Sequence, residues 1–125
     1  MKVRAFNKSD YSTVCEWWAA HKWPVIAYEL LPSTGLIVED RCAGFIYKTD
    51  SGFCLFEWVV SNPNTNKEER SEALDTLINE GIKLSKEMGF KVIFTCVSHP
   101  KLIERYKKHE YQVTDSNVTT FVRVL

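Results

Sequence analysis

Glu57 stands in the sequence where a carboxylate has most reason to do chemistry. It interrupts the apolar run from Phe53 to Val59, and a carboxylate is costly to bury there unless it is paired or lines a cleft. The alternative is an exposed glutamate on the solvent side of a strand. His99 suits either proton transfer or a loop or capping role, whereas His21 lies in a Trp-rich helical stretch where a packed or surface histidine is expected.

The cysteines offer no second chemistry. They are scattered, form no CxxC pair and have no histidine at ligand spacing, so we predict no metal site and no redox motif. A catalytic cysteine would need a histidine partner, and no motif supplies one. We expect reduced, structural thiols in a cytoplasmic protein, with the two that lie in apolar runs buried. The four are Cys15, Cys42, Cys54 and Cys96.

Length and charge exclude several classes of protein. The chain has 125 residues, which suits a single domain over residues 1–125. Lys+Arg and Asp+Glu are equal at 16 each, which argues against a dedicated nucleic-acid binder. The N-terminus has no apolar core of a signal peptide, and no apolar stretch approaches the roughly 20 residues of a membrane helix. We therefore expect no nucleic-acid or membrane partner.

Hydrophobic periodicity divides the chain into alternating strands and helices. The first helix begins after Ser9 or Ser12, either of which can cap it, and ends near Trp23 because Pro24 follows. Residues 25–32 fit either a short helix or an irregular crossing. A long amphipathic helix at residues 67–88 ends at Gly89, a suitable C-cap, and a short helix covers residues 100–109. The predicted strands are 2–6, 36–39, 43–49, 53–60, 91–97, 111–114 and 119–124.

This order predicts an α/β (α+β) fold with a mixed, mostly antiparallel sheet flanked by helices. Strands 36–39, 43–49 and 53–60 have connections too short for a parallel crossover, so they form an antiparallel meander. The long helix then crosses to a buried strand at 91–97, and the last two strands close the sheet as a hairpin.

Two landmarks give this order a family resemblance. Val59-Val60-Ser61-Asn62-Pro63 leads into a long helix with Ala73-Leu74 at the gapless position of a small-Leu pair. Farther on, the segment from His99 to Tyr111 carries Tyr106-x-Lys108 between a strand and the closing hairpin. The chain thereby resembles the GNAT superfamily of acyl-CoA N-acyltransferases over nearly its whole length. It also looks like small GNAT-like proteins encoded by bacteriophages, which would place it in a host cytoplasm.

The resemblance implies acetyl-CoA as co-substrate and assigns roles to individual residues. The acceptor would be an amine of a small molecule or a protein. Glu57 would be the base and Tyr106 the acid that protonates the leaving thiolate. The backbone of Val59 and Val60 would hold the pantetheine arm. The phosphate loop would use Asn66, Lys67, Arg70 and Ser71.

The phosphate loop departs from the family pattern and leaves two functions open. Glu68 and Glu69 occupy the first helical turn, where a carboxylate satisfies the helix dipole as a phosphate would, and Thr65-x-x-Glu68 fits a capping box. One function is an acyl-CoA-dependent N-acetyltransferase acting on an unknown amine. The other is a non-catalytic GNAT-fold interaction or virion-associated protein with a degenerate CoA loop. A homodimer paired through the terminal hairpin is a further expectation.

Overall fold

The fold is built around one five-stranded sheet whose strands follow each other in chain order. A computed structural model describes residues 1–125. Strands β1 to β4 are antiparallel to their neighbours, and β5 lies parallel to β4 at the edge. The strands are β1 (Val3–Ala5), β2 (Thr34–Val38), β3 (Cys42–Lys48), β4 (Phe53–Ser61) and β5 (Val92–Phe94). The mixed, mostly antiparallel sheet predicted from the sequence is confirmed.

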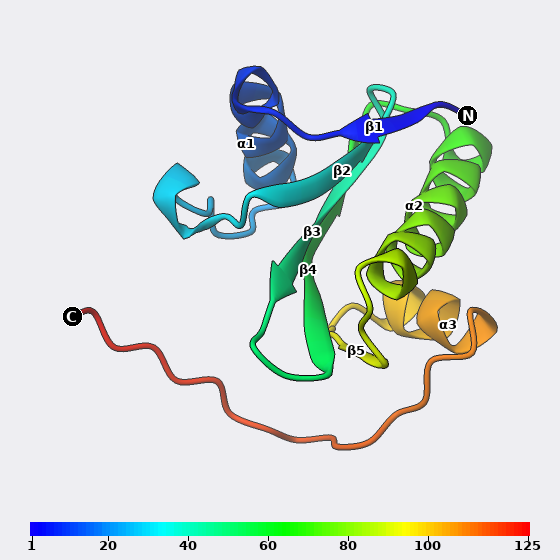
Figure 1. Ribbon diagram of the computed structural model, residues 1–125. Helices are drawn as coiled ribbons and strands as arrows, with labels where there is room; N and C mark the ends of the chain where they lie inside the picture. The colour runs from blue at the N-terminus through cyan, green and yellow to red at the C-terminus, as the bar shows by residue number, and fades with distance from the viewer.

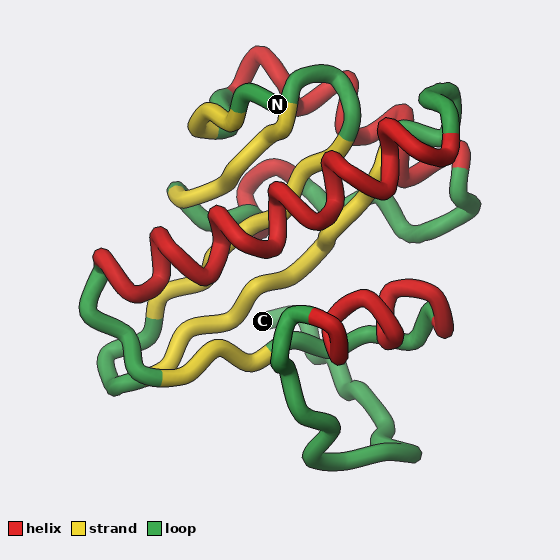
Figure 2. Tube along the Cα trace, turned by 90° about the vertical axis from the view of Figure 1, so that its right-hand side faces the viewer, coloured by secondary structure: helices red, strands yellow, loops and turns green.

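Helices cover both faces of the sheet (Figure 1). Helix α1 (Tyr11–Ala20) lies on one face and buries Val14, Trp17 and Trp18 against β2, β3 and β4. Helix α2 (Lys67–Glu87) runs along the opposite face, as Figure 2 shows from the side. Helix α3 (Pro100–Lys108) follows β5 on the side of α2. No helix is both long enough and apolar enough to cross a membrane.

The start of α1 differs from the sequence prediction. Neither Ser9 nor Ser12 is the N-cap: a 3₁₀ turn at Lys8–Asp10 precedes the helix, and Asn7 caps that turn by accepting from the Ser9 N–H. The Asp10 carboxylate accepts from the Asn7 N–H in return, which completes a capping box. Residues 25–32 are mostly irregular, with one 3₁₀ turn at Tyr28–Leu30.

Helix α2 is fixed at both ends by its own sequence. Asn66 is the N-cap and accepts from the Glu69 N–H at 2.8 Å. At the other end Gly89 adopts a φ of +91°, as expected, and its N–H bonds to the Lys86 carbonyl. The next N–H, of Phe90, bonds to the Ser85 carbonyl, which makes this end a Schellman motif.

The face of α2 that meets the sheet is closely packed around one aromatic ring. Phe56 of β4 is buried between β3 and α2. A Cβ added at Gly44 would lie 2.6 Å from the Phe56 ring, and one added at Gly81 of α2 would lie 3.2 Å from it. The absence of a side chain at both glycines therefore sets how closely α2 approaches the sheet.

The C-terminal third of the prediction is wrong in two respects. Strand β5 is shorter than residues 91–97, and it is not buried, since Val92 and Phe94 keep 49% and 47% of their surface exposed. The closing strands at 111–114 and 119–124 do not form, and the chain after Tyr111 extends away from the body (Figure 1). Ile93 packs on the α2 side of the sheet, whereas Val92 and Phe94 point to the other face, where neither joins the core under α1. The nearby Cys96, predicted to be buried, is exposed as well.

Replacing Gly44 by alanine is expected to destabilise the fold by roughly 1–3 kcal/mol, the usual cost of overpacking a core. The Phe56 ring has little room to move, because it is fully buried and Gly81 of α2 also lies close to it. Gly52→Ala is the matched control: its new Cβ would come no nearer than 4.0 Å to Lys91, so a change within about 0.5 kcal/mol is expected. Urea unfolding of both variants makes the comparison, and equal midpoints would contradict it.

Candidate functional site

The candidate site lies where β4 and β5 separate. Leu55 and Phe94 are the last paired residues of the two strands. Beyond them the strands are joined by side chains: the Thr95 hydroxyl donates to the Phe56 carbonyl at 2.6 Å, and the Cys96 N–H donates to the Glu57 carboxylate at 3.1 Å. The second half of β4 therefore has no strand beside it on this side of the sheet.

A β-bulge in β4 sits at the point of separation. Ala43 pairs with Val60 and Phe45 with Glu57, so Gly44 alone faces both Trp58 and Val59. Trp58 adopts a φ of +59°, a left-handed conformation that costs an L-residue roughly 1–2 kcal/mol. The bulge lets Phe56 and Val59 both face α2, while Val60 packs on the α1 side.

Two tryptophan indoles hold this strained backbone. The Trp18 indole donates to the Trp58 carbonyl at 3.4 Å, and the Trp58 indole donates to the Tyr47 hydroxyl at 2.7 Å. Trp18 is itself buried under the sheet with Trp17, so the surrounding core keeps the bulge in place. The bulge is thus built into the fold rather than left to a loose loop.

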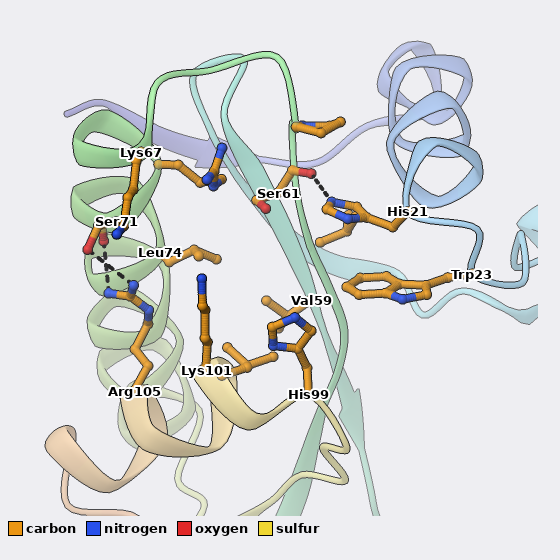
Figure 3. Close-up of a pocket in the computed structure, with 14 residues that line it drawn as sticks. His21, Trp23, Val59, Ser61, Lys67, Ser71, Leu74, His99, Lys101 and Arg105 are labelled. Atoms are coloured by element: carbon orange, nitrogen blue, oxygen red, sulfur yellow. Dashed lines mark hydrogen bonds between the residues drawn. The ribbon is translucent and has the colours of Figure 1, made fainter.

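A pocket of about 380 Å³ opens along the free part of β4 (Figure 3). One wall is β4, a second is the first half of α2, a third is the start of α3, and the end of α1 closes the rim. The lining residues are His21, Trp23, Val59, Val60, Ser61, Pro63, Lys67, Arg70, Ser71, Leu74, His99, Lys101, Leu102 and Arg105. Five of the predicted cofactor residues therefore meet here, and Asn66 does not.

The charge of this pocket is entirely basic. Four cationic side chains line it and no aspartate or glutamate does. Arg70 donates to the Thr65 carbonyl, and Arg105 donates to Asp75 and to Ser71. Lys67 and Lys101 have no salt bridge, and Figure 3 shows the Lys101 amine extended into the space between α2 and β4.

The two glutamates of the first helical turn do not occupy the pocket. The predicted Thr65–Glu68 capping box is wrong by one residue, because Asn66 is the cap and the Thr65 hydroxyl bonds to the Asn62 carbonyl instead. Glu69 forms an ion pair with Arg41 of the β2–β3 turn. Glu68 is exposed on the outer side of α2. The loop is self-capped as expected, but its carboxylates face away from the basic cavity.

Glu57 has the properties of a base that works near neutral pH. Its side chain is half-buried, and burial raises its pKa to about 7, although the hydrogen bond from the Cys96 N–H partly opposes the rise. A carboxyl with such a pKa is partly ionised at physiological pH, so its carboxylate form can accept a proton.

Tyr106 places a protonated phenol in the same region. The side chain is 4% exposed, and its hydroxyl has no hydrogen-bond partner. Burial raises its pKa far above the ordinary value, and the charge of Glu57 adds to the rise. The nearby Thr95 hydroxyl opposes this rise in pKa, although it donates to the Phe56 carbonyl and forms no hydrogen bond with the Tyr106 hydroxyl. Glu57 and Tyr106 thus lie beside Cys96 and Thr95 respectively, at the strand separation and just outside the residues that line the basic pocket.

Several pocket residues were not assigned to the site from the sequence. Lys101 and Arg105 come from α3, whose first turn reaches the pocket only after the chain has folded. His21 bonds to the Ser61 carbonyl at 2.8 Å and stacks on Trp23 at the rim. Trp17 and Trp18 of α1 are core residues and do not line this pocket. No group of histidine, cysteine and carboxylate side chains is placed to hold a metal ion.

Comparison with known proteins places the fold. No family model matches the chain, and no curated protein matches its sequence. A candidate acetyltransferase of Agrobacterium tumefaciens superposes with a TM-score of 0.73 at 11% identity, covering 98% of this chain and 100% of the other. Rv2747 of Mycobacterium tuberculosis, solved in complex with CoA and NLQ, gives a TM-score of 0.70 at 12% identity, covering 95% and 76%.

A third solved structure has the same fold under a different description. A transcriptional regulator of Bacillus halodurans superposes with a TM-score of 0.73 at 10% identity, covering 97% of this chain and 99% of the other. Identities this low carry the fold and not the activity. The chain therefore has the GNAT-like α/β fold that its two sequence landmarks predicted.

Proposed function

We propose that this protein is an acyl-CoA-dependent N-acetyltransferase that acts on an amine. The observation that carries the proposal is the acid-free, basic pocket that opens along the unpaired half of β4. A CoA molecule is a chain of phosphates and amides, and this pocket offers cations at one end and a free strand at the other. Structures of the same fold that are acetyltransferases or hold CoA support the same assignment.

The residues present fit the phosphates of acetyl-CoA. The first N–H groups of a helix have no partner inside the helix, and here Asn66 takes only that of Glu69. The N–H groups of Lys67 and Glu68 remain for an anion, which the helix dipole also favours. The amines of Lys67 and Lys101, which form no ion pair, add charge from two helices. Phosphate binding by cations here replaces the glycine-rich loop that the sequence lacks.

The remaining residues fit the thioester end. The backbone of Val59 and Val60 offers strand-like hydrogen bonds to the amides of the pantetheine arm, because no neighbouring strand occupies them on the side of β5. Acetyl-CoA, when bound, supplies an acyl group already activated as a thioester. Glu57 accepts a proton from the attacking amine, directly or through water. Tyr106 donates its hydroxyl proton to the departing sulfur and so gains the partner that it lacks.

A non-catalytic interaction protein is the second candidate function. The self-capped loop at Asn66 and the regulator of the same fold favour it. A virion-associated role and a phage origin remain predictions that the comparisons do not support. Location in the cytoplasm likewise remains a prediction. Binding of CoA without turnover of any amine would favour this second function.

Replacing Lys101 by alanine is expected to weaken CoA binding about tenfold, since one charge-assisted contact is worth roughly 1.4 kcal/mol. Lys108→Ala is the matched control, because this lysine lies on the same helix, forms no ion pair and is outside the pocket. Titration calorimetry with CoA measures both affinities. The same loss in both variants would show a general effect of charge, and no heat from the unmodified protein at millimolar CoA would remove the enzyme proposal.

Glu57→Gln is expected to lower kcat by about 10²- to 10⁴-fold, the usual contribution of a general base. A base acts when it is ionised, so kcat/KM of the unmodified enzyme should rise with pH through about 7, the raised pKa of Glu57. The Gln variant should lose this rise while its CoA affinity stays unchanged. An unchanged pH profile in the variant would assign the ionisation to another group.

Tyr106→Phe is expected to lower kcat without lowering stability. The hydroxyl has no partner in the fold, so its removal leaves no group unsatisfied and spares a buried polar atom. Thermal unfolding should therefore give a midpoint equal to or above that of the unmodified protein. A lower midpoint with unchanged kcat would mean that the hydroxyl has a structural bond and no catalytic role.

A further inference from the structure

The outer edge of β5 is an unpaired strand edge. β5 pairs with β4 on one side only, and no strand lies on its other side. Its exposed Val92 and Phe94 carry no charge that would repel another strand. Natural proteins usually protect such an edge with charge, proline, a bulge or a covering segment. None of the three residues of β5 is charged or proline, so the short length of the strand, which is itself a common protection, is what remains against pairing at this edge.

The C-terminal segment Val118–Leu125 has the chemistry of a strand but no strand to pair with. Its sequence, Val-Thr-Thr-Phe-Val-Arg-Val-Leu, consists mainly of residues enriched in sheets and carries one charged side chain. No backbone hydrogen bond joins it to the rest of the chain. Phe121 and Val124 are 88% and 89% exposed. Alternating side chains would place Val118, Val122 and Val124 on one face of a strand.

The direction of the chain keeps this segment away from its own edge. After Tyr111 it runs in an extended course that leaves the sheet and ends well clear of the body (Figure 1). It does not fold back as a hairpin, although Asn117 has the left-handed φ of a turn residue at +57°. Every copy of the protein therefore carries an open edge at β5, besides the edge at β1 on the far side of the sheet, and one unpaired strand-forming segment.

We propose that two copies of this chain exchange their C-terminal segments, each Val118–Leu125 pairing with β5 of the other copy. A two-fold arrangement satisfies both edges at once and leaves no further edge-and-segment pair to extend the assembly. Each exchange buries the valine face of the segment beside Val92 and Phe94, which removes apolar surface from water. The proposal does not depend on acetyl-CoA or on catalysis.

Sedimentation of the full chain tests the exchange. The unmodified protein should be a dimer at micromolar concentration. The double variant Val122→Asp with Val124→Asp should raise the dissociation constant at least tenfold, because it buries two carboxylates in an apolar contact. Gln112→Asp with Ser116→Asp adds the same charge to the tail outside the pairing segment and should remain dimeric. A monomeric unmodified protein, or a dimer that the first variant leaves intact, overturns the proposal.

A cross-link separates exchange between copies from pairing within one copy. Cys96 lies exposed two residues beyond β5, and Val122→Cys supplies its counterpart on the segment. A short bis-maleimide should give a covalent dimer on a denaturing gel, and Cys96→Ser should abolish it. A monomer cross-linked within itself means that the segment closes its own sheet, and no cross-link at all means that it pairs with neither edge; both results overturn the proposal.

Discussion

The loss of pairing between β4 and β5 after Leu55 and Phe94 is the constraint on which the site depends. A continued ladder would satisfy the backbone of β4 and leave no room for a ligand. Instead, the Thr95 hydroxyl and the Glu57 carboxylate take over the bonds at the separation, which keeps it open without leaving those groups unpaired. The bulge at Trp58 turns the rest of β4 along the start of α2. Pocket, base and phenol all follow from this one opening.

The charges at the start of α2 show how a loop that departs from the family pattern can still suit a phosphate. In the sequence, the two glutamates of the first turn suggest that phosphates would be repelled. The sequence shows which charges are present but not which way each side chain points. In the fold Arg41 neutralises Glu69 from the opposite side, and Lys101 reaches in from α3. The Arg105–Asp75 ion pair ties α3 to α2 and so fixes where that lysine stands. The electrostatics of the site are therefore a tertiary property, although every charge is visible in the sequence.

Local signals explain what could be predicted. The sheet order and α2 followed from apolar periodicity and from Gly89, whose role needs only its own backbone. The predicted N-cap of α2 was one residue too early because Thr65 and Asn66 are both good caps. A shift of one residue changes the direction in which Glu68 and Glu69 point. Glu57 stood out by interrupting an apolar run, and Val59, Val60 and Tyr106 came from a resemblance. Lys101 and His21 could not be assigned to the site, since nothing in their own segments marks them. The closing strands failed for a different reason: a strand needs a partner, and propensity does not supply one.

Three departures from local rules lie together at the strand separation. Four other non-glycine residues also have a left-handed φ, but each lies in a turn or bend, where such a φ is less unusual than inside a strand: Lys22, Glu39, Glu110 and Asn117. The left-handed Trp58, the carboxyl of Glu57 with its raised pKa and the unbonded hydroxyl of Tyr106 all lie at the strand separation. Each of these three features lowers the stability of the fold. Unfavourable features of this kind persist where the surrounding core holds them in place. Trp18 and Tyr47 hold the bulge. A purely structural module would have no reason to keep three such costs side by side, which favours a ligand that bonds there.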